Sequence, residues 1–435
     1  MSTQSPSTPP ALSRTLCSAL PDVPPGSEVL LRAWVHRRRE LAQVAFLVLR
    51  DRSGLAQVVV REGRERLAAL PEETTVEVRG RVVQNDSAPG GVEVVDPVLT
   101  PLTEPAETPP VELWRPSLDA GLATLLDHAA VTWRHPARRR SWEVAAASLR
   151  GFRATLDGLR FTEVCTPKLV GGATETGATV FEVDYFGRTA YLAQSPQLHK
   201  QQLVGVFERV YEVGPVFRAE PHDTARHLAQ YTSLDVELGF VEDHHDVLAV
   251  LRDVLAGMSA EVAALGHGVE VAVPDQIPVV HFSEALSIAG APADEPDLSP
   301  AHERAVGAWA LAEHGSDLVA VEGYPLAARP FYTHPWTGPE RPGAPGSNGF
   351  DVLLRGVELV TGGQRLHTPS AYAAVMAERG IDPAPYADHL RAFAHGMPPH
   401  GGFAIGLERW VSRLVGAANV REVTLYPRDL HRLSP

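Results

Sequence analysis

The sequence predicts an α+β chain of two domains, a small N-terminal β-barrel and a larger domain built on an antiparallel sheet flanked by helices. Short alternating apolar segments, bounded by turn residues, fill residues 28–103, and a Pro-rich segment at 101–110 closes them. Beyond it, strand-like and helix-like segments come in separate runs without regular βαβ alternation, which is typical of α+β domains. A chain of 435 residues is long enough for both domains.

The first domain has the pattern of a five-stranded OB-fold, which we place at residues 21–104. Its segments alternate β-branched with polar residues, and turn signals such as Ser53–Gly54 and Pro89–Gly91 separate them. Five short strands with one short helix at 64–70 match this small barrel in size. The other expected parts are a flexible leader, a linker or hinge, and the second domain, at 1–20, 105–135 and 136–435.

Composition excludes several classes of protein. At 44% hydrophobic and 21% charged residues the chain builds a core, and no apolar run is long enough to span a membrane. Two cysteines cannot form a disulfide framework, and the N-terminus lacks the pattern of a secretion signal, so we expect a cytoplasmic protein. A net charge of −14 argues against non-specific coating of nucleic acid, although the Arg37–Arg39 triplet lets the barrel meet a polyanion.

One candidate group of chemical residues lies at 216–237. Arg218 ends a strand-like segment and Glu220 follows it, then come the run Arg226–Leu228 and the carboxylates Asp235 and Glu237. An arginine in such a place can fork onto phosphate or carboxylate oxygens and stabilise charge during phosphoryl displacement. A glutamate can accept hydrogen bonds from the amino group of a base. Taken alone, the arginine and glutamate are more often an ordinary surface ion pair.

Two further groups follow. Asp351 and Glu358 lie seven apart on a strand-like segment and could hold Mg²⁺ near a triphosphate, although a solvated acidic edge explains the spacing equally well. The segment Gly401–Arg409 has glycines that let a nucleotide approach the backbone and an arginine that could clamp phosphates. A glycine-rich segment alone is weak support for a nucleotide site, whereas the three groups in one sequence are not.

Together these groups resemble motifs 2 and 3 of the class II aminoacyl-tRNA synthetases, and the helix–strand segment with Pro167 resembles motif 1. An N-terminal OB-fold narrows the resemblance to the subgroup that charges aspartate, asparagine or lysine. The segments FRAEPHDTARHLAQYTSLDVELGF, GVELVTGGQRLH, GMPPHGGFAIGLER and REVTLYPRDLHRLSP are similar to those of compact archaeal-type aspartyl-tRNA synthetases. The resemblance runs from about Glu28 to the C-terminus.

This resemblance implies ATP-dependent activation of L-aspartate to aspartyl-adenylate, with Mg²⁺ as cofactor, and transfer to tRNA. Arg218 and Arg409 take the catalytic positions. Glu358 and the hydroxyl of Thr361, where serine is usual, match the metal positions, and Asp351 is a further ligand. The residues that match the ATP site are Arg218, Ala219, Glu220, Arg226, His227, Leu228, Glu358, Gly406, Leu407, Glu408 and Arg409.

For the amino acid, the resemblance implies that Arg365 forks onto the side-chain carboxylate. An amide there would leave buried donors unpaired, at a cost of roughly 1–3 kcal/mol per group. Lys200 is one of only two lysines among 39 cationic residues, which suits a compact point charge beside a small carboxylate. The residues that match the aspartate pocket are Glu175, Gln197, Leu198, His199, Lys200, Arg218, Thr361 and Arg365.

In the barrel, Phe46 and Gln57 match the positions that stack on the central anticodon uridine and hydrogen-bond to it. Synthetases restricted to tRNA-Asp tend to have tryptophan where this chain has His36. Those that also charge tRNA-Asn tend to have histidine there and a proline at the position of Pro89. The resemblance therefore implies a non-discriminating enzyme that aspartylates both tRNAs and needs an amidotransferase to convert the mischarged product.

Four alternatives remain open. A discriminating aspartyl-tRNA synthetase or an asparaginyl-tRNA synthetase would share the fold, although Arg365 and Lys200 argue against asparagine on charge. A non-catalytic tRNA-binding protein should have lost Arg218, Glu358 or Arg409, and all three are present. A tRNA-independent asparagine synthetase would not need the barrel. Because motif 1 forms a dimer interface in the family, a homodimer is expected.

Overall fold

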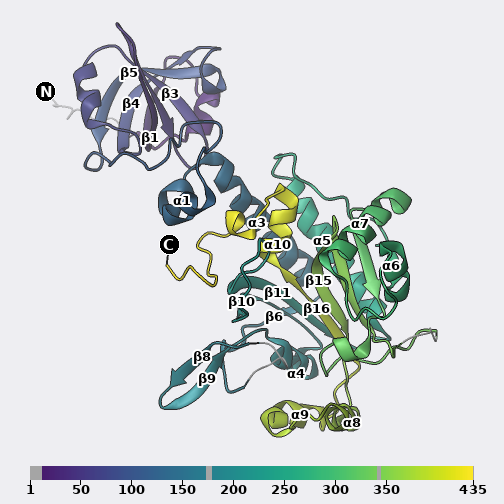
Figure 1. Cartoon of the computed structure of the whole chain (residues 1–435). Helices are drawn as coiled ribbons and strands as arrows, with labels where there is room; N and C mark the ends of the chain where they lie inside the picture. Colours follow the sequence, from purple (N-terminus) through teal and green to yellow (C-terminus); the bar gives the residue numbers. More distant parts are fainter. Residues whose placement is uncertain (1–11, 173–178, 340–343, 435) are drawn as a thin grey trace, which may run out of the picture. The chain divides into compact units, whose positions relative to one another are not determined.

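A computed structural model of the chain describes residues 12–172, 179–339 and 344–434 (Figure 1). The chain divides into two compact units, Met1–Ala137 and Arg138–Pro435. The region expected as a linker, 105–135, belongs to the first unit and contains the short helices α1 (Leu122–Asp127) and α2 (Ala129–Thr132).

The first unit contains a closed five-stranded barrel in the order β1-β2-β3-β5-β4. The β3–β5 pair is parallel and the other neighbouring pairs are antiparallel. Alternate side chains of β1, namely Val29, Leu31, Ala33 and Val35, fill the interior, so the period-2 pattern of the sequence explains the barrel. The predicted OB-fold is confirmed. Its strands are β1 (Glu28–Glu40), β2 (Ala45–Arg50), β3 (Leu55–Val60), β4 (Thr75–Gln84) and β5 (Val92–Pro101).

The second half of the expected leader is part of the barrel, which corrects that expectation. A 3₁₀ helix, Cys17–Asp22, places Cys17 and Leu20 in the barrel core. The backbone N–H of Cys17 donates to Oδ2 of Asp51 across 2.9 Å. Two apolar side chains are enough to anchor the segment, and the Ser/Pro-rich composition around them concealed this. Residues 1–11 lie outside the described residues.

An eight-stranded sheet forms the frame of the second unit, in the order β12-β13-β14-β15-β16-β11-β10-β6. Neighbours from β13 to β10 are antiparallel, whereas the edge pairs β12–β13 and β10–β6 are parallel. The predicted antiparallel sheet is therefore confirmed for its centre, and its edges make it mixed. Its strands are β6 (Thr162–Glu163), β10 (Arg209–Phe217), β11 (Gln230–Gly239), β12 (Val279–His281), β13 (Leu318–Glu322), β14 (Gly349–Leu354), β15 (Val357–Gln364) and β16 (His400–Gly406).

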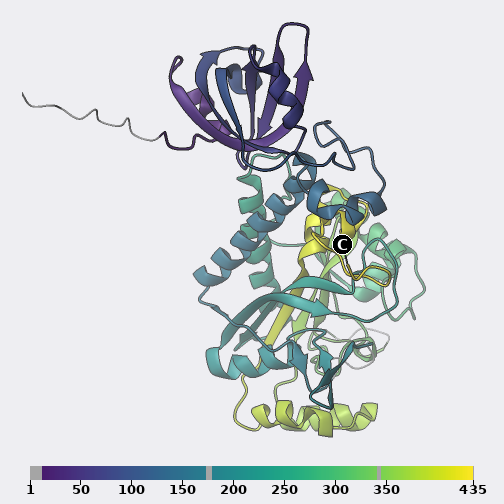
Figure 2. The ribbon, with the colours of Figure 1, turned by 90° about the vertical axis from the view of Figure 1, so that its left-hand side faces the viewer.

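Helices flank this sheet as predicted. Figure 2 shows two of the long helices, α3 and α5, close together, and a Cβ on Gly151 of α3 would lie only 2.4 Å from the carbonyl oxygen of Gly257 of α5. A small second sheet joins β7 (Leu169–Val170), β9 (Arg188–Leu192) and β8 (Glu182–Tyr185). The helices are α3 (Pro136–Gly158), α4 (Gln197–Phe207), α5 (His244–Ala263), α6 (Phe282–Ala289), α7 (Pro300–His314), α8 (Pro369–Arg379), α9 (Ala387–Phe393) and α10 (Leu407–Val415).

The central strands separate an apolar face of the sheet from a polar one. In β11, Leu234 and Val236 belong to the main core together with side chains of α3, α5 and α10, whereas the alternating residues Ser233, Asp235 and Glu237 are buried and polar. Because neighbouring side chains on a strand point to opposite faces, these polar groups all lie on the face away from that core. None of the described helices combines the length and apolar character needed to cross a bilayer.

Candidate active site

A cavity lies on the polar face, at the ends of β10, β11, β15 and β16. It brings together most of the residues predicted for the nucleotide. It also adds residues that the sequence did not single out, among them His222, Tyr231 and Leu430. The cavity is lined by Arg218, Glu220, His222, Arg226, His227, Leu228, Ala229, Tyr231, Ser233, Glu358, Leu359, Thr361, Ala404, Gly406, Glu408, Arg409, Val420 and Leu430.

Arg218 stands at the point where β10 ends and the loop 218–229 begins. Its backbone N–H donates to the carbonyl of Ala229 across 2.9 Å, which closes the base of this loop. The guanidinium carbon lies 5.6 Å from the centre of the Tyr231 ring, a cation–π distance. The arginine is thereby placed against a rigid strand, and its planar group is suited to fork onto the oxygens of a phosphate.

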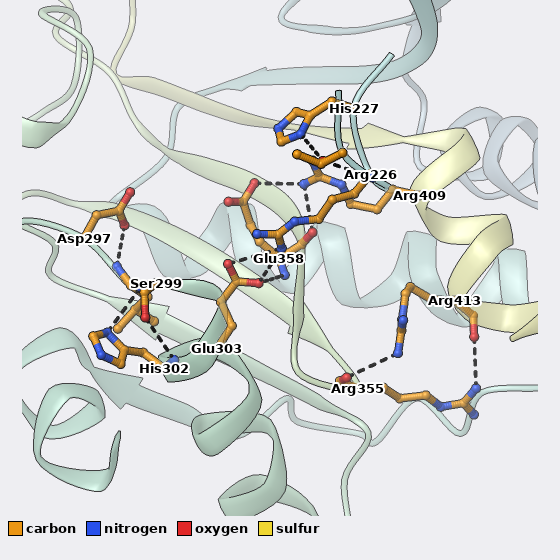
Figure 3. A network of polar contacts seen from close by, with 12 residues as sticks. Arg226, His227, Asp297, Ser299, His302, Glu303, Arg355, Glu358, Arg409 and Arg413 are labelled. Carbon is orange, nitrogen blue, oxygen red and sulfur yellow. Dashed lines mark hydrogen bonds and ion pairs between the residues drawn. The ribbon is translucent and has the colours of Figure 1, made fainter. Parts of the chain in front are cut away.

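The start of α10 supplies the other predicted catalytic arginine. Arg409 donates from Nη1 to the carbonyl oxygen of Glu358 across 2.9 Å and lies 3.2 Å from its Oε1 (Figure 3). Glu408 accepts from the backbone N–H of Thr232 with both oxygens at 3.0 Å, and burial raises the pKa of its carboxyl. The side chain of Leu407 packs in the apolar core, so only its backbone could meet a nucleotide, and its place at the ATP site stays a prediction.

The three predicted metal ligands lie together on β14 and β15. Asp351 is the cross-strand partner of Thr361, whose Oγ1 lies 3.5 Å from Oε1 of Glu358. Arg329 holds Asp351 in a two-point contact, with Nη1–Oδ1 and Nη2–Oδ2 distances of 3.1 and 2.7 Å. Burial and the neighbouring Asp351 carboxylate raise the pKa of Glu358. Two carboxylates that disfavour each other's charge, with a hydroxyl beside them, form a donor set of hard oxygens that fits Mg²⁺.

Four buried charged groups form a cluster on the same face of the sheet as the cavity. Lys200 on α4 lies 3.0 Å from Asp235 and 3.3 Å from Glu237, and Arg365 donates from Nε to Glu237 across 3.0 Å. Burial opposes the charge of Glu237, but the Arg365 and Lys200 cations hold the pKa of its carboxyl below the ordinary value. Ser233 donates to the free side of Asp235 across 2.5 Å. The cluster therefore presents two buried cations in fixed positions.

The other predicted aspartate-binding residues of α4 point in different directions. Gln197 is buried, and among the described residues its Nε2 has no hydrogen-bond partner, as expected of a group that awaits a polar ligand. Leu198 packs against the apolar cluster of α8 and α9. Burial lowers the pKa of His199, and the negative charge of Glu212 opposes this shift in part. Gln197 and Lys200 are therefore the members that the geometry favours for a substrate. Glu175 lies outside the described residues.

In the barrel, Phe46 and Gln57 occupy outward-facing positions of the adjacent strands β2 and β3. The Arg39 guanidinium carbon lies 6.0 Å from the centre of the Phe46 ring. Gln57 donates from Nε2 to Glu93 across 3.0 Å, so its amide oxygen could accept from a donor such as N3–H of uracil. Pro89 is exposed in the loop between β4 and β5. Phe46 and Arg39 therefore combine an aromatic ring with a cation, as a site for an unstacked base requires.

His36, predicted from the resemblance to take part in tRNA choice, is a buried residue of the barrel. It sits at a bulge of β1, is only 6% exposed and has its Nδ1 3.1 Å from Nη1 of Arg50. Arg50 in turn makes two hydrogen bonds of 2.8 Å to Glu73, which also accepts from Arg134 across 3.0 Å. Burial and the Arg50 charge lower the pKa of His36 to about 4, so its imidazole is neutral at physiological pH.

Besides His222, Tyr231 and Leu430, sequence inspection gave no indication of Glu303 and Arg329, which hold predicted site residues in place. Glu303 lies in the first turn of α7, where acidic residues are common for reasons of helix stability alone. Arg329 is one of many arginines and lies 22 residues from Asp351, its partner. Only the folded chain brings Glu303 and Arg329 to their partners, so no local pattern could have identified them.

The comparisons with known proteins agree with this geometry. The family described as tRNA synthetases class II (D, K and N) matches residues 122–430, and the OB-fold nucleic acid binding domain matches residues 29–102. This chain belongs to the class II tRNA synthetases of the D, K and N type. Its predicted membership of this class, and its nature as an aminoacyl-tRNA synthetase with an OB-fold tRNA-binding domain, are confirmed.

Two relatives of this synthetase are named Aspartate--tRNA(Asp/Asn) ligase. The one from Thermus thermophilus is 45% identical over 94% of this chain and 97% of its own length. The one from Deinococcus radiodurans is 43% identical over 98% of this chain and 99% of its own length. A solved asparaginyl-tRNA synthetase from Pyrococcus horikoshii, complexed with asparaginyl-adenylate, superimposes with a TM-score of 0.86 at 28% identity, over 98% of this chain and all of that one. The fold alone therefore does not separate aspartate from asparagine.

Proposed function

We propose that this synthetase is an aspartate–tRNA(Asp/Asn) ligase, which activates L-aspartate with ATP and aspartylates both tRNA-Asp and tRNA-Asn. The observation that carries the choice of amino acid is the pair of buried cations, Lys200 and Arg365, fixed by Glu237 on the face of the sheet that bears the cavity. Arg365 uses Nε for Glu237 and Nη2 for the Gly402 carbonyl, so its Nη1 has no hydrogen-bond partner among the described residues. A side-chain carboxylate would supply that partner, whereas the NH₂ group of asparagine would face two cations.

In the first step, an α-carboxylate oxygen of aspartate attacks the α-phosphorus of ATP. A bond forms between these atoms, the bond to the bridging oxygen breaks, and pyrophosphate leaves with that electron pair. Arg218 is placed to stabilise the charge that develops at the α-phosphate, and Arg409 to clamp the leaving pyrophosphate. The protein's contribution is positioning and electrostatic stabilisation rather than covalent catalysis.

Glu358, Asp351 and Thr361 would hold Mg²⁺, which supplies charge neutralisation of the triphosphate when bound. His222 and His227 border the same cavity, with ring centres 4.9 Å apart. Burial and neighbouring positive groups lower the pKa of His227 to about 4, so its imidazole borders the cavity in the neutral form. It can donate a hydrogen bond to a phosphate without adding a charge.

In the second step the 3′-terminal hydroxyl of tRNA attacks the aspartyl carbonyl and releases AMP. Charging of both tRNAs is supported by the names of the two relatives at 45 and 43% identity. The two anticodons differ only in C against U at the third letter, so the outcome depends on few side chains. We propose that His36 and Pro89 contribute, with His36 acting in concert with Arg50. A product mischarged on tRNA-Asn then requires an amidotransferase. The synthetase would act in the cytoplasm as a homodimer.

Asparagine activation is the competing function, because a solved asparaginyl-tRNA synthetase shares the fold. ATP–pyrophosphate exchange separates the two, because it measures the first step without tRNA. We expect kcat/KM for exchange with aspartate to exceed that for asparagine by about 10⁴-fold, the discrimination typical of a site whose buried polar groups are built to pair with one substrate group. Equal or faster exchange with asparagine would contradict the proposal.

A further inference from the structure

Helix α7 (Pro300–His314) places a buried carboxylate against two residues that line the nucleotide cavity, from outside the three sequence motifs. Glu303 lies in its first turn and is only 5% exposed. A buried carboxylate is costly unless it is paired and hydrogen-bonded, so its partners show what it does. Figure 3 shows Glu303 directed toward Arg226 and Glu358, two residues predicted to bind ATP or its metal.

The first partner of Glu303 is the backbone of Glu358. Oε2 of Glu303 accepts from the N–H of Glu358 across 2.9 Å. This N–H lies beside an irregularity in β15, because Leu353 pairs with Glu358 while Val352 pairs with Val360. The extra residue at this bulge weakens the strand ladder locally. At this bulge the side chain of Glu303 therefore helps to hold the backbone of Glu358 in place.

The second partner is Arg226, from the loop between β10 and β11. Its Nη1 lies 3.2 and 3.5 Å from the two oxygens of Glu303. Both contacts use the same nitrogen, and Nε and Nη2 have no hydrogen-bond partner among the described residues. Because Arg226 also lines the cavity, one edge of its guanidinium is anchored while the other can meet a phosphate.

The anchor itself is rigid. Ser299 and His302 form a reciprocal capping box at the start of α7. A Cβ on Gly307 would lie 2.5 Å from Cα of Gly356, which immediately precedes β15, so helix and turn touch backbone to backbone. Close packing of this kind leaves little freedom for the helix to shift against the strand. Glu303 thus presents its carboxylate at a fixed place.

We propose that Glu303 is a positioning residue for the nucleotide, which holds Arg226 over the cavity and fixes the backbone of Glu358 for metal binding. The inference rests on the proposed function, since it assumes that the cavity takes ATP with Mg²⁺. Glu303 touches neither substrate nor metal and acts through the two residues that do. Its negative charge beside Glu358 also favours a cation at that site.

The test compares Glu303→Gln and Glu303→Ala with Glu313→Gln, an exposed glutamate at the far end of the same helix. Calorimetry measures the Kd of ATP with Mg²⁺ for each protein, and aspartate-dependent pyrophosphate exchange measures KM for ATP and kcat. Urea unfolding shows whether each variant folds. The amide is nearly isosteric and keeps an acceptor for the N–H of Glu358, so Glu303→Gln serves as the conservative variant.

We expect Glu303→Gln to raise the Kd and KM for ATP about tenfold, the effect of losing one charge-assisted hydrogen bond, while kcat stays within about threefold. Glu303→Ala should bind ATP more weakly still, and Glu313→Gln should have the same Kd and KM for ATP as the parent. An unchanged or tighter Kd in Glu303→Gln overturns the proposal, as does a loss of kcat with unchanged KM. If the parent binds ATP but does not activate aspartate, a weakened Glu303→Gln still supports the anchor while the proposed function fails. If the parent does not bind ATP, both fail.

Discussion

Arg365 donates from Nε to Oε1 of Glu237 across 3.0 Å, and both side chains are buried. The partners are separated by 128 residues in sequence and meet on the polar face of the sheet. Gly402 makes this possible, because a Cβ there would lie 2.1 Å from Oε2 of Glu237. One glycine of the segment Gly401–Arg409 therefore makes room for a carboxylate, a different role from the nucleotide approach that the sequence suggested.

Removing the charge of Glu237 should be costly. In Glu237→Gln the buried Arg365 and Lys200 lose a shared counter-charge, and we expect the free energy of unfolding to fall by about 3 kcal/mol, as for other broken buried pairs. Urea unfolding measures this. The control Glu261→Gln removes an exposed partner of Arg150 and should change stability by less than about 0.5 kcal/mol. Equal stabilities of the two variants would show that the cluster is not held by this ion pair.

The two lysines provide a matched pair for testing the aspartate pocket. Lys200 is almost fully buried between Asp235 and Glu237, whereas Lys168 pairs with Glu212 and is 22% exposed. A guanidinium is larger and planar, so Lys200→Arg should crowd the pocket and lower kcat/KM for aspartate by about 100-fold. Lys168→Arg should stay within about threefold of the parent. Pyrophosphate exchange at varied aspartate checks both, and similar losses in the two variants would contradict the assignment of Lys200.

A pH effect on stability is expected at the start of α5. His245 lies 3.0 Å from both Glu322 and Asp243, and these carboxylates raise its pKa to about 9. A raised histidine pKa stabilises the fold fully below the unfolded value of 6.5, and the contribution is lost as the pH rises through about 9. Burial raises the pKa of Glu322, but its hydrogen bonds to His244 and His245 outweigh this and lower the pKa to about 2. The stability that the Glu322 carboxylate contributes is therefore lost only in strong acid.

Urea unfolding of the parent and of His245→Gln should therefore differ most near pH 6 and converge above about pH 9. About half of the His245 side chain is exposed, so we expect the difference to stay below about 1 kcal/mol and to shrink in salt. A gap that widens with rising pH would contradict the sign of this effect.

His36 gives a prediction for tRNA choice. The imidazole of His36 is buried and lies within hydrogen-bond distance of Arg50. In His36→Trp this contact is lost, and the larger indole must move the side chains around it. We expect kcat/KM for charging tRNA-Asn to fall about tenfold more than for tRNA-Asp, since one base contact is worth ~1–3 kcal/mol. Pyrophosphate exchange should be unchanged, because it needs no tRNA. Equal losses of kcat/KM for the two tRNAs would show that His36 does not discriminate between them and has a structural role only.

Much of the fold was predictable because its signals are local. The period-2 pattern in segments such as Glu28–Glu40 gave the barrel strands, and the alternation of Ser233, Asp235 and Glu237 with apolar residues marks a strand with one polar face. Arg218, Glu358 and Arg409 were predictable as a set from the family resemblance, and they meet at one cavity.

The rest depends on long-range packing. Glu303 acquires its role only when α7 packs on the turn before β15, 77 residues from Arg226 in sequence. A bulge of β1 and the Arg50–Glu73 pair bury His36, which no local pattern around it indicates. Cys17 and Leu20 were hidden in a segment whose neighbours are Ser, Thr and Pro. The burial and the partners of these residues depend on segments far away in the sequence, and no local pattern encodes such contacts.

The central claim is that this synthetase aspartylates two tRNAs. The most direct measurement is aspartate charging of unmodified tRNA-Asp and tRNA-Asn transcripts by the purified protein with ATP and Mg²⁺. We expect kcat/KM values for the two tRNAs that agree within about tenfold, because an enzyme that does not read the third anticodon base lacks the base contact, worth ~1–3 kcal/mol, that would separate them. Charging of tRNA-Asp alone would contradict the dual specificity, and charging of neither with aspartate would contradict the proposed function as a whole.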